Sequence, residues 1–395
     1  MLKWPAKRFR RKITRGFALT LATLLLLVCV YIVRLGSLTP GLSPAESSAR
    51  TGSSSIHLIA HQPANAPHKA LQYGLQKLGY QGALPMRLVS ALLAIILIGC
   101  FYKVSSRWFG KAVGWFSTVI FATTPLVILA GRSATPTILL LTPVAIICLY
   151  TWLTRDAKRL KIKFLIFLAA VSLSLYVPGM IWLLALGAIF GRRSLAALRS
   201  AISVPILLLS MLVPIGVLAP LGFEVFKHPA ILKSLALVPA HWLGIIAILK
   251  SIGWAAGGLV YRTSAHSDLI IGRLALLDIA QLILIVFGAY AMWHRARDKF
   301  YSLSALVLLA ILLSGLNQNL YLLLFALPPL GILIAAGLRY LYIEWKGVFP
   351  SNPIPRGLAI VLMLVIVSIQ VVYGVRYSLV AWPHSVATHS LYVLK

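Results

Sequence analysis

Acidic side chains are nearly absent from this sequence of 395 residues, in which seven Asp and Glu stand against 37 Lys and Arg. Charged residues make up only 11% of the chain, whereas soluble domains carry roughly 25%. Hydrophobic residues make up 60%. They recur in runs of about 18–23 residues, the length that a helix needs to cross a bilayer. These proportions exclude a soluble enzyme and predict an all-α fold, a polytopic transmembrane helical bundle.

Other common features are also missing. The three cysteines, Cys29, Cys100 and Cys148, all lie in apolar runs, so no disulfide framework is expected. The sequence contains no P-loop, Rossmann glycine motif or nucleophile elbow, which argues against an ATP-driven pump. Charges are scarce inside the apolar runs, whereas ion-coupled transporters keep such charges at mid-depth. Transport is therefore disfavoured.

Eleven membrane spans are predicted, the first of them an uncleaved helix that ends near Val33. The later spans are expected at about 87–104, 112–130, 134–153, 163–177, 179–191, 201–222, 275–293, 301–316, 319–342 and 357–379.

Basic residues set the orientation of these spans. If the N-terminus is cytoplasmic, the inner segments hold 24 of the 37 Lys and Arg in only about 68 residues. This bias predicts a multi-pass protein of the plasma (cytoplasmic) membrane with residues 1–16 as a cytoplasmic basic tail. The cations at the ends of apolar runs favour anionic lipid head groups as partners and not nucleic acid.

Two long segments are then expected outside, at 37–86 and 223–274, with an outer tail at 380–395. The stretch Ala236–Tyr261 is apolar but is interrupted by proline, lysine and a glycine-rich part, which predicts interfacial or re-entrant helices. We expect the whole chain, 1–395, to form a single membrane domain.

The first outer segment contains one acid, Glu46. Ser43, Pro44 and Glu46 have the spacing of a helix start with a capping box, in which Glu46 is the third helical residue. A second interpretation, compatible with the first, makes Glu46 the catalytic base that deprotonates or orients an acceptor hydroxyl.

Three histidines follow Glu46. His57 and His61 would share one helix face and with Glu46 could bind Zn²⁺ or Mn²⁺. Pro63 and the lack of an H-E-x-x-H pattern weigh against this site. No metal and no other cofactor are therefore expected, with a divalent metal kept as the alternative.

Arg132 stands in a tight outer turn, where a guanidinium could grip a lipid phosphate through two hydrogen bonds or could simply extend to the membrane interface. Arg262 and Arg273 present the same choice. The candidate substrate-binding residues are Arg132, Arg262, Arg273, His61, His68 and Lys69.

The order of these parts resembles the GT-C fold of membrane glycosyltransferases, in particular the group of protein O-mannosyltransferases and lipid A aminoarabinose transferases. The resemblance rests on the acid behind the first span and on the segments Leu84–Ala91, Gly131–Pro136 and Ala326–Pro329. The family's Asp-Glu pair is here Ala45-Glu46, and its second acidic position is Thr137. The family's C-terminal soluble domain is not expected in this chain.

The resemblance implies transfer of a sugar from a polyprenyl-phosphate donor to a glycan, lipid or protein acceptor at the outer membrane face, with Glu46 as base. Two alternatives stay open: a catalytically degenerate membrane subunit, and a transporter or flippase of a lipid-linked sugar.

Overall fold

The computed structural model describes residues 25–39, 41–154, 159–200, 202–239, 242, 244–263, 269–348 and 353–392. Within these ranges the regular elements are helices, and one isolated β-bridge pairs Arg262 with Leu274. The predicted cytoplasmic tail, 1–16, lies outside the described residues, as does most of the first span, of which residues 25–32 are helical.

Three short helices form the first long segment between spans: α2 (Pro44–Gly52), α3 (Ile56–His61) and α4 (Ala66–Lys77). The remaining helices are α5 (Ala83–Phe109), α6 (Lys111–Ala122), α7 (Pro125–Arg132), η1 (Pro136–Leu141), α8 (Thr142–Leu153), α9 (Leu160–Ser174), α10 (Met180–Ser200), α11 (Val204–Ser210), α12 (Leu212–Lys227), α13 (Ala230–Leu235), α14 (Ile245–Val260), α15 (Ile279–Arg295), α16 (Arg297–Asn317), η2 (Leu320–Ala326), α17 (Leu327–Val348), α18 (Pro353–Arg376), η3 (Tyr377–Ala381) and α19 (Val386–Leu391).

The prediction of an all-α transmembrane bundle is confirmed. Seven described helices are long and apolar enough to cross a membrane, and the bent pair α6 and α7 brings the number to eight. The pair bends by 65° at Thr123-Thr124, where Pro125 holds the residue before it in an extended conformation. Helices α9 and α15 coincide with two further predicted spans but have only 15 and 17 residues.

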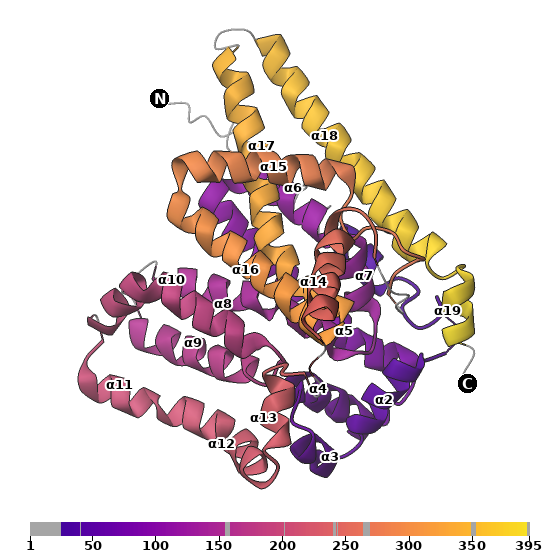
Figure 1. Cartoon of the computed structure of the whole chain (residues 1–395), viewed down its shortest axis with the longest axis vertical. Coiled ribbons are helices and arrows are strands. Elements are labelled where there is room, and N and C mark those ends of the chain that lie inside the picture. The colour runs from indigo at the N-terminus through magenta and orange to yellow at the C-terminus, as the bar shows by residue number, and fades with distance from the viewer. Residues whose placement is uncertain are drawn as a thin grey trace, which may run out of the picture.

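The centre of the bundle is α17, together with the η2 turn that precedes it (Figure 1). Glycines let α15 approach α17 closely: a Cβ added to Gly288 would lie 1.9 Å from the Leu333 carbonyl oxygen, and one added to Gly337 would lie 2.1 Å from that of Leu284. Small residues at helix crossings are the usual means of close packing in membranes, where lipid removes most of the hydrophobic drive between helices.

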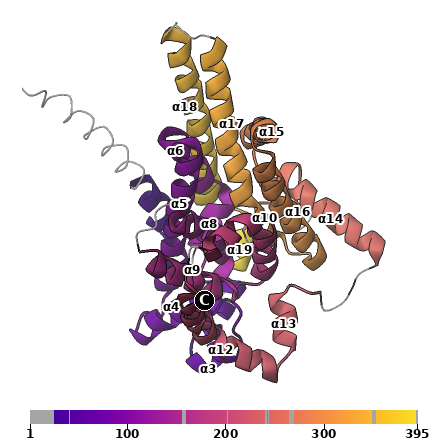
Figure 2. The ribbon, with the colours of Figure 1, turned by 90° about the vertical axis from the view of Figure 1, so that its left-hand side faces the viewer.

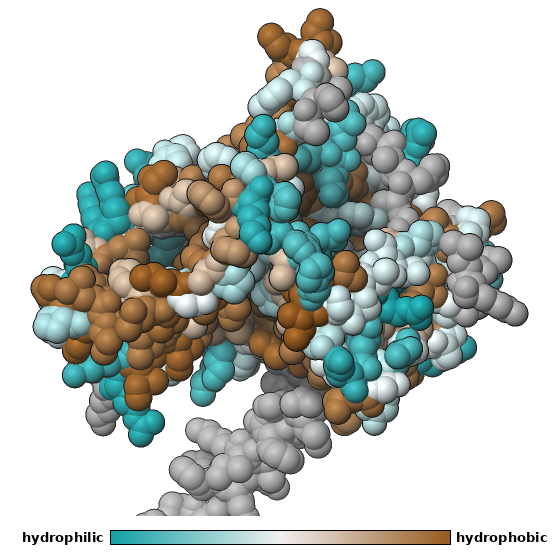
Figure 3. Space-filling view, turned by 90° about the horizontal axis from the view of Figure 1, so that it is seen from below, coloured by the Kyte–Doolittle hydropathy of each residue, from teal (hydrophilic) through white to brown (hydrophobic). Residues whose placement is uncertain are grey.

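Helices α2, α3 and α4 gather at one end of the bundle, beside the end of α12, while α17 and α18 project from the opposite end (Figures 1 and 2). Seen from the end that carries α2–α4, the half of the surface on the side of α9–α12 is mainly hydrophobic (Figure 3). The half on the side of α2–α4 mixes hydrophilic and hydrophobic residues (Figure 3). The long segment between the first two spans therefore forms a partly polar cap on one end of an apolar bundle.

Candidate functional site

Glu46 is placed by the local sequence at the start of α2. Ser43 is the N-cap, and its hydroxyl accepts the Glu46 N–H at 3.2 Å, while Glu46 Oε2 accepts the Ser43 N–H at 3.1 Å. Pro44 fits the first helical position because its missing N–H would have no partner there. The predicted capping box is therefore confirmed. It fixes the direction of the Glu46 side chain, which is 1% exposed.

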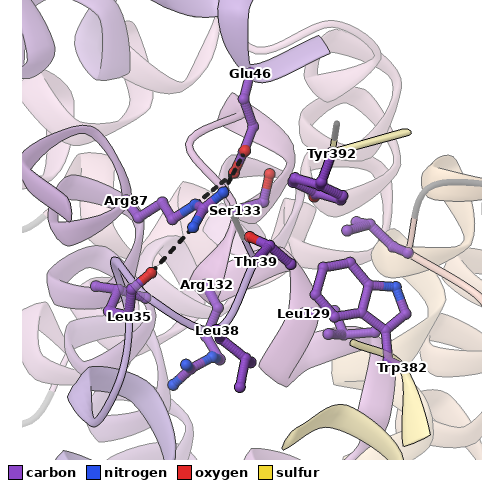
Figure 4. A pocket seen from close by; sticks show the side chains of 11 residues that line it. Leu35, Leu38, Thr39, Glu46, Arg87, Leu129, Arg132, Ser133, Trp382 and Tyr392 are labelled. Atoms are coloured by element: carbon purple, nitrogen blue, oxygen red, sulfur yellow. Dashed lines mark hydrogen bonds and ion pairs between the residues drawn. The ribbon is translucent and has the colours of Figure 1, made fainter. Parts of the chain in front are cut away.

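Arg87 on α5 is the main partner of Glu46 (Figure 4). Its Nε donates to Oε1 at 3.0 Å and its Nη2 to Oε2 at 2.8 Å, in a pair of which both side chains are buried. The same guanidinium donates to the carbonyls of Leu35 at 3.1 Å and Gly41 at 2.6 Å. A buried ion pair needs such additional hydrogen bonds to offset the loss of water. Arg87 thus joins the end of the first span, the outer segment and α5.

The turn after α7 completes the environment of Glu46. The Ala134 N–H donates to Glu46 Oε1 at 2.8 Å, so four donors from three parts of the chain meet one carboxylate. In the same turn the hydroxyls of Ser133, Thr135 and Thr137 form a series with spacings of 2.8 Å. The position at which the resembling family has an acid therefore carries a hydrogen-bonded threonine.

Arg132 ends α7 and is 6% exposed. Its Nη1 donates to the Val30 carbonyl at 2.7 Å and its Nη2 to the Val33 carbonyl at 3.0 Å. These carbonyls belong to the end of the first span, where a helix lacks internal donors and favours a cation. The predicted outer-surface arginine is thus a buried contact between the first span and α7.

Glu46, Arg87 and Arg132 line one small pocket of about 10 Å³, which is room for about one water molecule. Trp382 and Tyr392, from the C-terminal part of the chain, close its other side (Figure 4). The Arg87 guanidinium lies 5.7 Å from the centre of the Tyr392 ring, and the Trp382 and Tyr392 rings are 5.6 Å apart. Two aromatic side chains therefore form part of the wall of this charged pocket.

His68 on α4 is fully buried beside this centre but does not line the pocket. Ser90 Oγ lies 2.9 Å from His68 Nε2 and donates to the Thr135 carbonyl at 3.2 Å. Because the serine has a single hydrogen, His68 donates from Nε2, and its Nδ1 is an unprotonated acceptor without a partner. Burial lowers the pKa of His68 to about 4, so the ring is neutral at pH 7. A neutral ring has no charge to offer a phosphate.

The other predicted binding residues lie away from the pocket. Lys69 Nζ donates to the Gln62 carbonyl at 2.7 Å, and burial lowers the pKa of Lys69. Arg262 and Arg273 are exposed on the segment that follows α14. His61 contacts Glu224 of α12 at 2.7 Å and not Glu46, because Arg87 holds Glu46 at α5. Asp268 and His266, two polar residues of the second outer segment, lie outside the described residues.

Sequence reasoning assigned no role to two residues that complete these contacts, Arg87 and Glu224. Arg87 entered the sequence analysis only within Leu84–Ala91, a segment that resembles the family. A lone arginine at the start of an apolar helix usually pairs with an acid, and this signal could have identified it. Glu224 lies 163 positions from His61, and no local pattern connects them.

Comparisons with known proteins identify chains of similar sequence and fold. Residues 68–223 match the model of the dolichyl-phosphate-mannose-protein mannosyltransferase family. ArnT from Cupriavidus metallidurans, solved with bound undecaprenyl phosphate, is similar over 94% of this chain and 76% of its own, with a TM-score of 0.59 at 13% identity. Its apo structure gives a TM-score of 0.61 at 14% identity, over 96% of this chain and 77% of that one. No curated protein matches by sequence.

The chain is a multi-pass membrane protein with the GT-C fold of membrane glycosyltransferases. Its residues 68–223, from α4 to α12, carry the sequence pattern of the mannosyltransferase family.

Proposed function

We propose that this protein is a glycosyltransferase that moves a sugar from a polyprenyl-phosphate donor to a glycan, lipid or protein acceptor at the outer face of the cytoplasmic membrane. The observation that carries the proposal is the meeting of Glu46, Arg87 and Arg132 in one pocket of a GT-C fold. The bound undecaprenyl phosphate of the similar ArnT structure supports a donor of this class. The positive-inside bias supports an outer location for the segment that carries Glu46.

The chemistry needs a cation for the departing phosphate and a base for the acceptor hydroxyl. In the arrangement described, Arg87 and Glu46 satisfy each other and neither group is available. A donor phosphate that accepts hydrogen bonds from Arg87 would release the Glu46 carboxylate, which becomes more basic when the guanidinium leaves. Binding of the donor would then itself produce the base. The pocket is too small for a phosphate, so some of the side chains that line it would move when the donor enters.

A second function, that of a non-catalytic membrane subunit, is favoured by how Glu46 is held and by its neighbours in sequence. Four donors engage the Glu46 carboxylate, Ala45 precedes it, and Thr137 stands at the family's second acidic position. A carboxylate that keeps these four hydrogen bonds would hold Arg87 in position and would not act as a base. A transporter has less support, because the described cavity of about 390 Å³ between α8, α9 and α10 is lined by apolar side chains and one tyrosine.

Purified protein in lipid nanodiscs, given a panel of polyprenyl-phosphate sugars, tests the proposal. We expect Glu46→Gln to lower kcat by about 10²–10⁴-fold, the typical contribution of a general base. It should also tighten donor binding, because the phosphate no longer competes with a carboxylate for Arg87. Glu344→Gln is the matched control, since Glu344 forms an exposed ion pair with Arg295. Its kcat should equal that of the wild type.

Each other outcome selects an alternative. Equal turnover in Glu46→Gln and wild type would remove Glu46 as the base. Donor binding without turnover across the whole panel would indicate the subunit. Movement of the lipid-linked sugar between leaflets with no new glycosidic bond would indicate the transporter.

A further inference from the structure

A second polar centre lies where α3 meets the end of α12, and it is built from histidines. Two of the nine histidines, His61 and His228, contact Glu224, one of only seven acids, and a third, His57, contacts His61. Helices α3 and α12 lie side by side in both views of the ribbon (Figures 1 and 2). The centre therefore joins the outer segment to a helix that follows it by more than 150 residues.

The ligand atoms have spacings that suit a metal ion. His61 Nδ1 lies 2.7 Å from Glu224 Oε1, His228 Nε2 lies 3.8 Å from the same oxygen, and one ligand atom from each residue falls within 4.8 Å of the others. Bonds of about 2.0–2.1 Å in a tetrahedral site separate the ligand atoms by roughly 3.4 Å. The observed spacings bracket that value, so small side-chain rotations would admit an ion.

Burial of the three side chains also suits a metal site with an open position. The Glu224 side chain is 6% exposed and is held in place, whereas His61 and His228 are 44% and 61% exposed and can adjust. The nearby cation Lys227 lies on α12 with its Nζ 4.2 Å from the centre of the Phe223 ring. Three protein ligands leave the fourth tetrahedral position to water.

His57 adds an outer contact of the kind that metal sites use. Its Nε2 lies 3.0 Å from His61 Nε2, so it bonds the ring nitrogen of His61 that does not face Glu224. Such a partner fixes the orientation of a ligating imidazole, and its loss typically weakens metal affinity about 10–100-fold.

We propose that His61, Glu224 and His228 bind a divalent cation of the Zn²⁺ class, which clamps α3 to the end of α12. Two imidazoles and one carboxylate suit zinc and its neighbours, whereas Ca²⁺ and Mg²⁺ require mainly oxygen ligands. The clamp is independent of glycosyl transfer: it uses none of the residues around Glu46.

The test is Zn²⁺ binding by the full chain in detergent, measured after removal of metal with a chelator, as stoichiometry and as Kd in competition with a chromogenic chelator. We expect one Zn²⁺ per chain. Both His61→Ala and Glu224→Gln should weaken binding at least 100-fold, and His57→Ala about 10-fold. His389→Ala, which removes an exposed histidine of α19, should change nothing.

A ligand-preserving variant separates metal loss from misfolding. His228→Cys should still bind one ion and, loaded with Co²⁺, should show a sulfur-to-cobalt charge-transfer band that the wild type lacks. Wild-type binding no tighter than that of the His61→Ala/His228→Ala double variant would overturn the proposal and leave an ordinary cluster of histidines on one acid. The proposal would also be overturned by a folded His228→Cys protein that lacks this band and binds Zn²⁺ no more tightly than His61→Ala.

Discussion

Glu46 and Glu224 both fasten the outer segment to the membrane helices, but through partners of opposite character. Glu46 is 1% exposed and meets a guanidinium and two backbone amides, which link it to α5 and to the turn after α7. Glu224 meets imidazoles whose side chains are about half exposed. Both acids are buried, but Glu46 belongs to a closed network, whereas the partners of Glu224 reach the accessible surface.

The difference between arginine and histidine decides what each centre can do. Arginine keeps its charge at every accessible pH, so the Glu46–Arg87 pair changes only when another anion competes for the guanidinium. Histidine is a common metal ligand, so the Glu224 centre, unlike the Glu46 centre, offers ring nitrogens that a cation could bind. Substitutions that break the Glu46–Arg87 pair or the contacts of Glu224 test this difference between the two centres.

The largest effect should follow Arg87→Met, which leaves Glu46 buried without its cation. Removal of one partner of a buried ion pair typically costs about 3–5 kcal/mol. We expect a loss of this size in the free energy of unfolding, measured by reversible unfolding in mixed SDS micelles.

The double variant Glu46→Gln/Arg87→Met is the control for that loss. It removes both charges, so it should recover part of the stability, since the cost comes mainly from the unpaired carboxylate. A double variant as unstable as the sum of the two single variants would contradict the coupling of Glu46 to Arg87.

His68 provides the second largest effect, which depends on pH. Its pKa of about 4 in the folded protein lies below the value of 6.5 expected when it is exposed, so only the unfolded chain binds a proton between these values. Stability is therefore complete above pH 6.5 and falls as the pH drops toward 4, by about 3 kcal/mol for the full shift.

The measurement compares wild type with His68→Gln between pH 7.5 and pH 4.5. The acids of the chain titrate in both proteins, so the difference between the two curves isolates His68. A constant difference across the range would show that His68 is not buried in its neutral form.

Much of the fold follows from composition and short patterns in the sequence. Long apolar runs locate the helices, and the spacing of Ser43, Pro44 and Glu46 locates the start of α2, because these signals act within a few residues. Helix ends were less well predicted: the span expected at 201–222 is two helices, α11 and α12, and continues to Lys227. The residues around 222 are apolar and follow Pro220, so the sequence is compatible with a helix end at 222 or at Lys227.

Pairing across the fold could not be predicted in the same way. The partners of Glu46 and His61 lie 41 and 163 positions away, at distances where only three-dimensional packing selects the contact. Arg132 was expected to face outward because its turn looked exposed, yet the end of the first span covers it. The sequence therefore drew attention to Glu46 and His61 but not to the residues that they contact.

The third prediction compares the two acids directly. Glu224→Gln should lower the apparent melting temperature without added metal by less than about a third of the drop in Glu46→Gln. The histidine partners of Glu224 are about half exposed and can be hydrated when the acid is lost, whereas Arg87 would stay buried without its anion. Added Zn²⁺ should raise the melting temperature of the Glu46→Gln protein but not that of the Glu224→Gln protein. Equal drops in the two variants would remove the distinction between a closed centre and an accessible one.

The smallest effect should come from Glu344, whose ion pair with Arg295 provides a solvent-exposed reference for both centres. The two side chains are 57% and 50% exposed with an N–O distance of 3.3 Å, and such pairs contribute about 0–1 kcal/mol because water and salt screen them. Glu344→Gln should therefore leave the free energy of unfolding within about 1 kcal/mol of wild type. Its unfolding midpoint should also respond little to salt between low and physiological ionic strength. A loss as large as that of Arg87→Met would mean that exposure does not set the strength of these pairs, and the contrast between Glu46 and Glu224 would then need another cause.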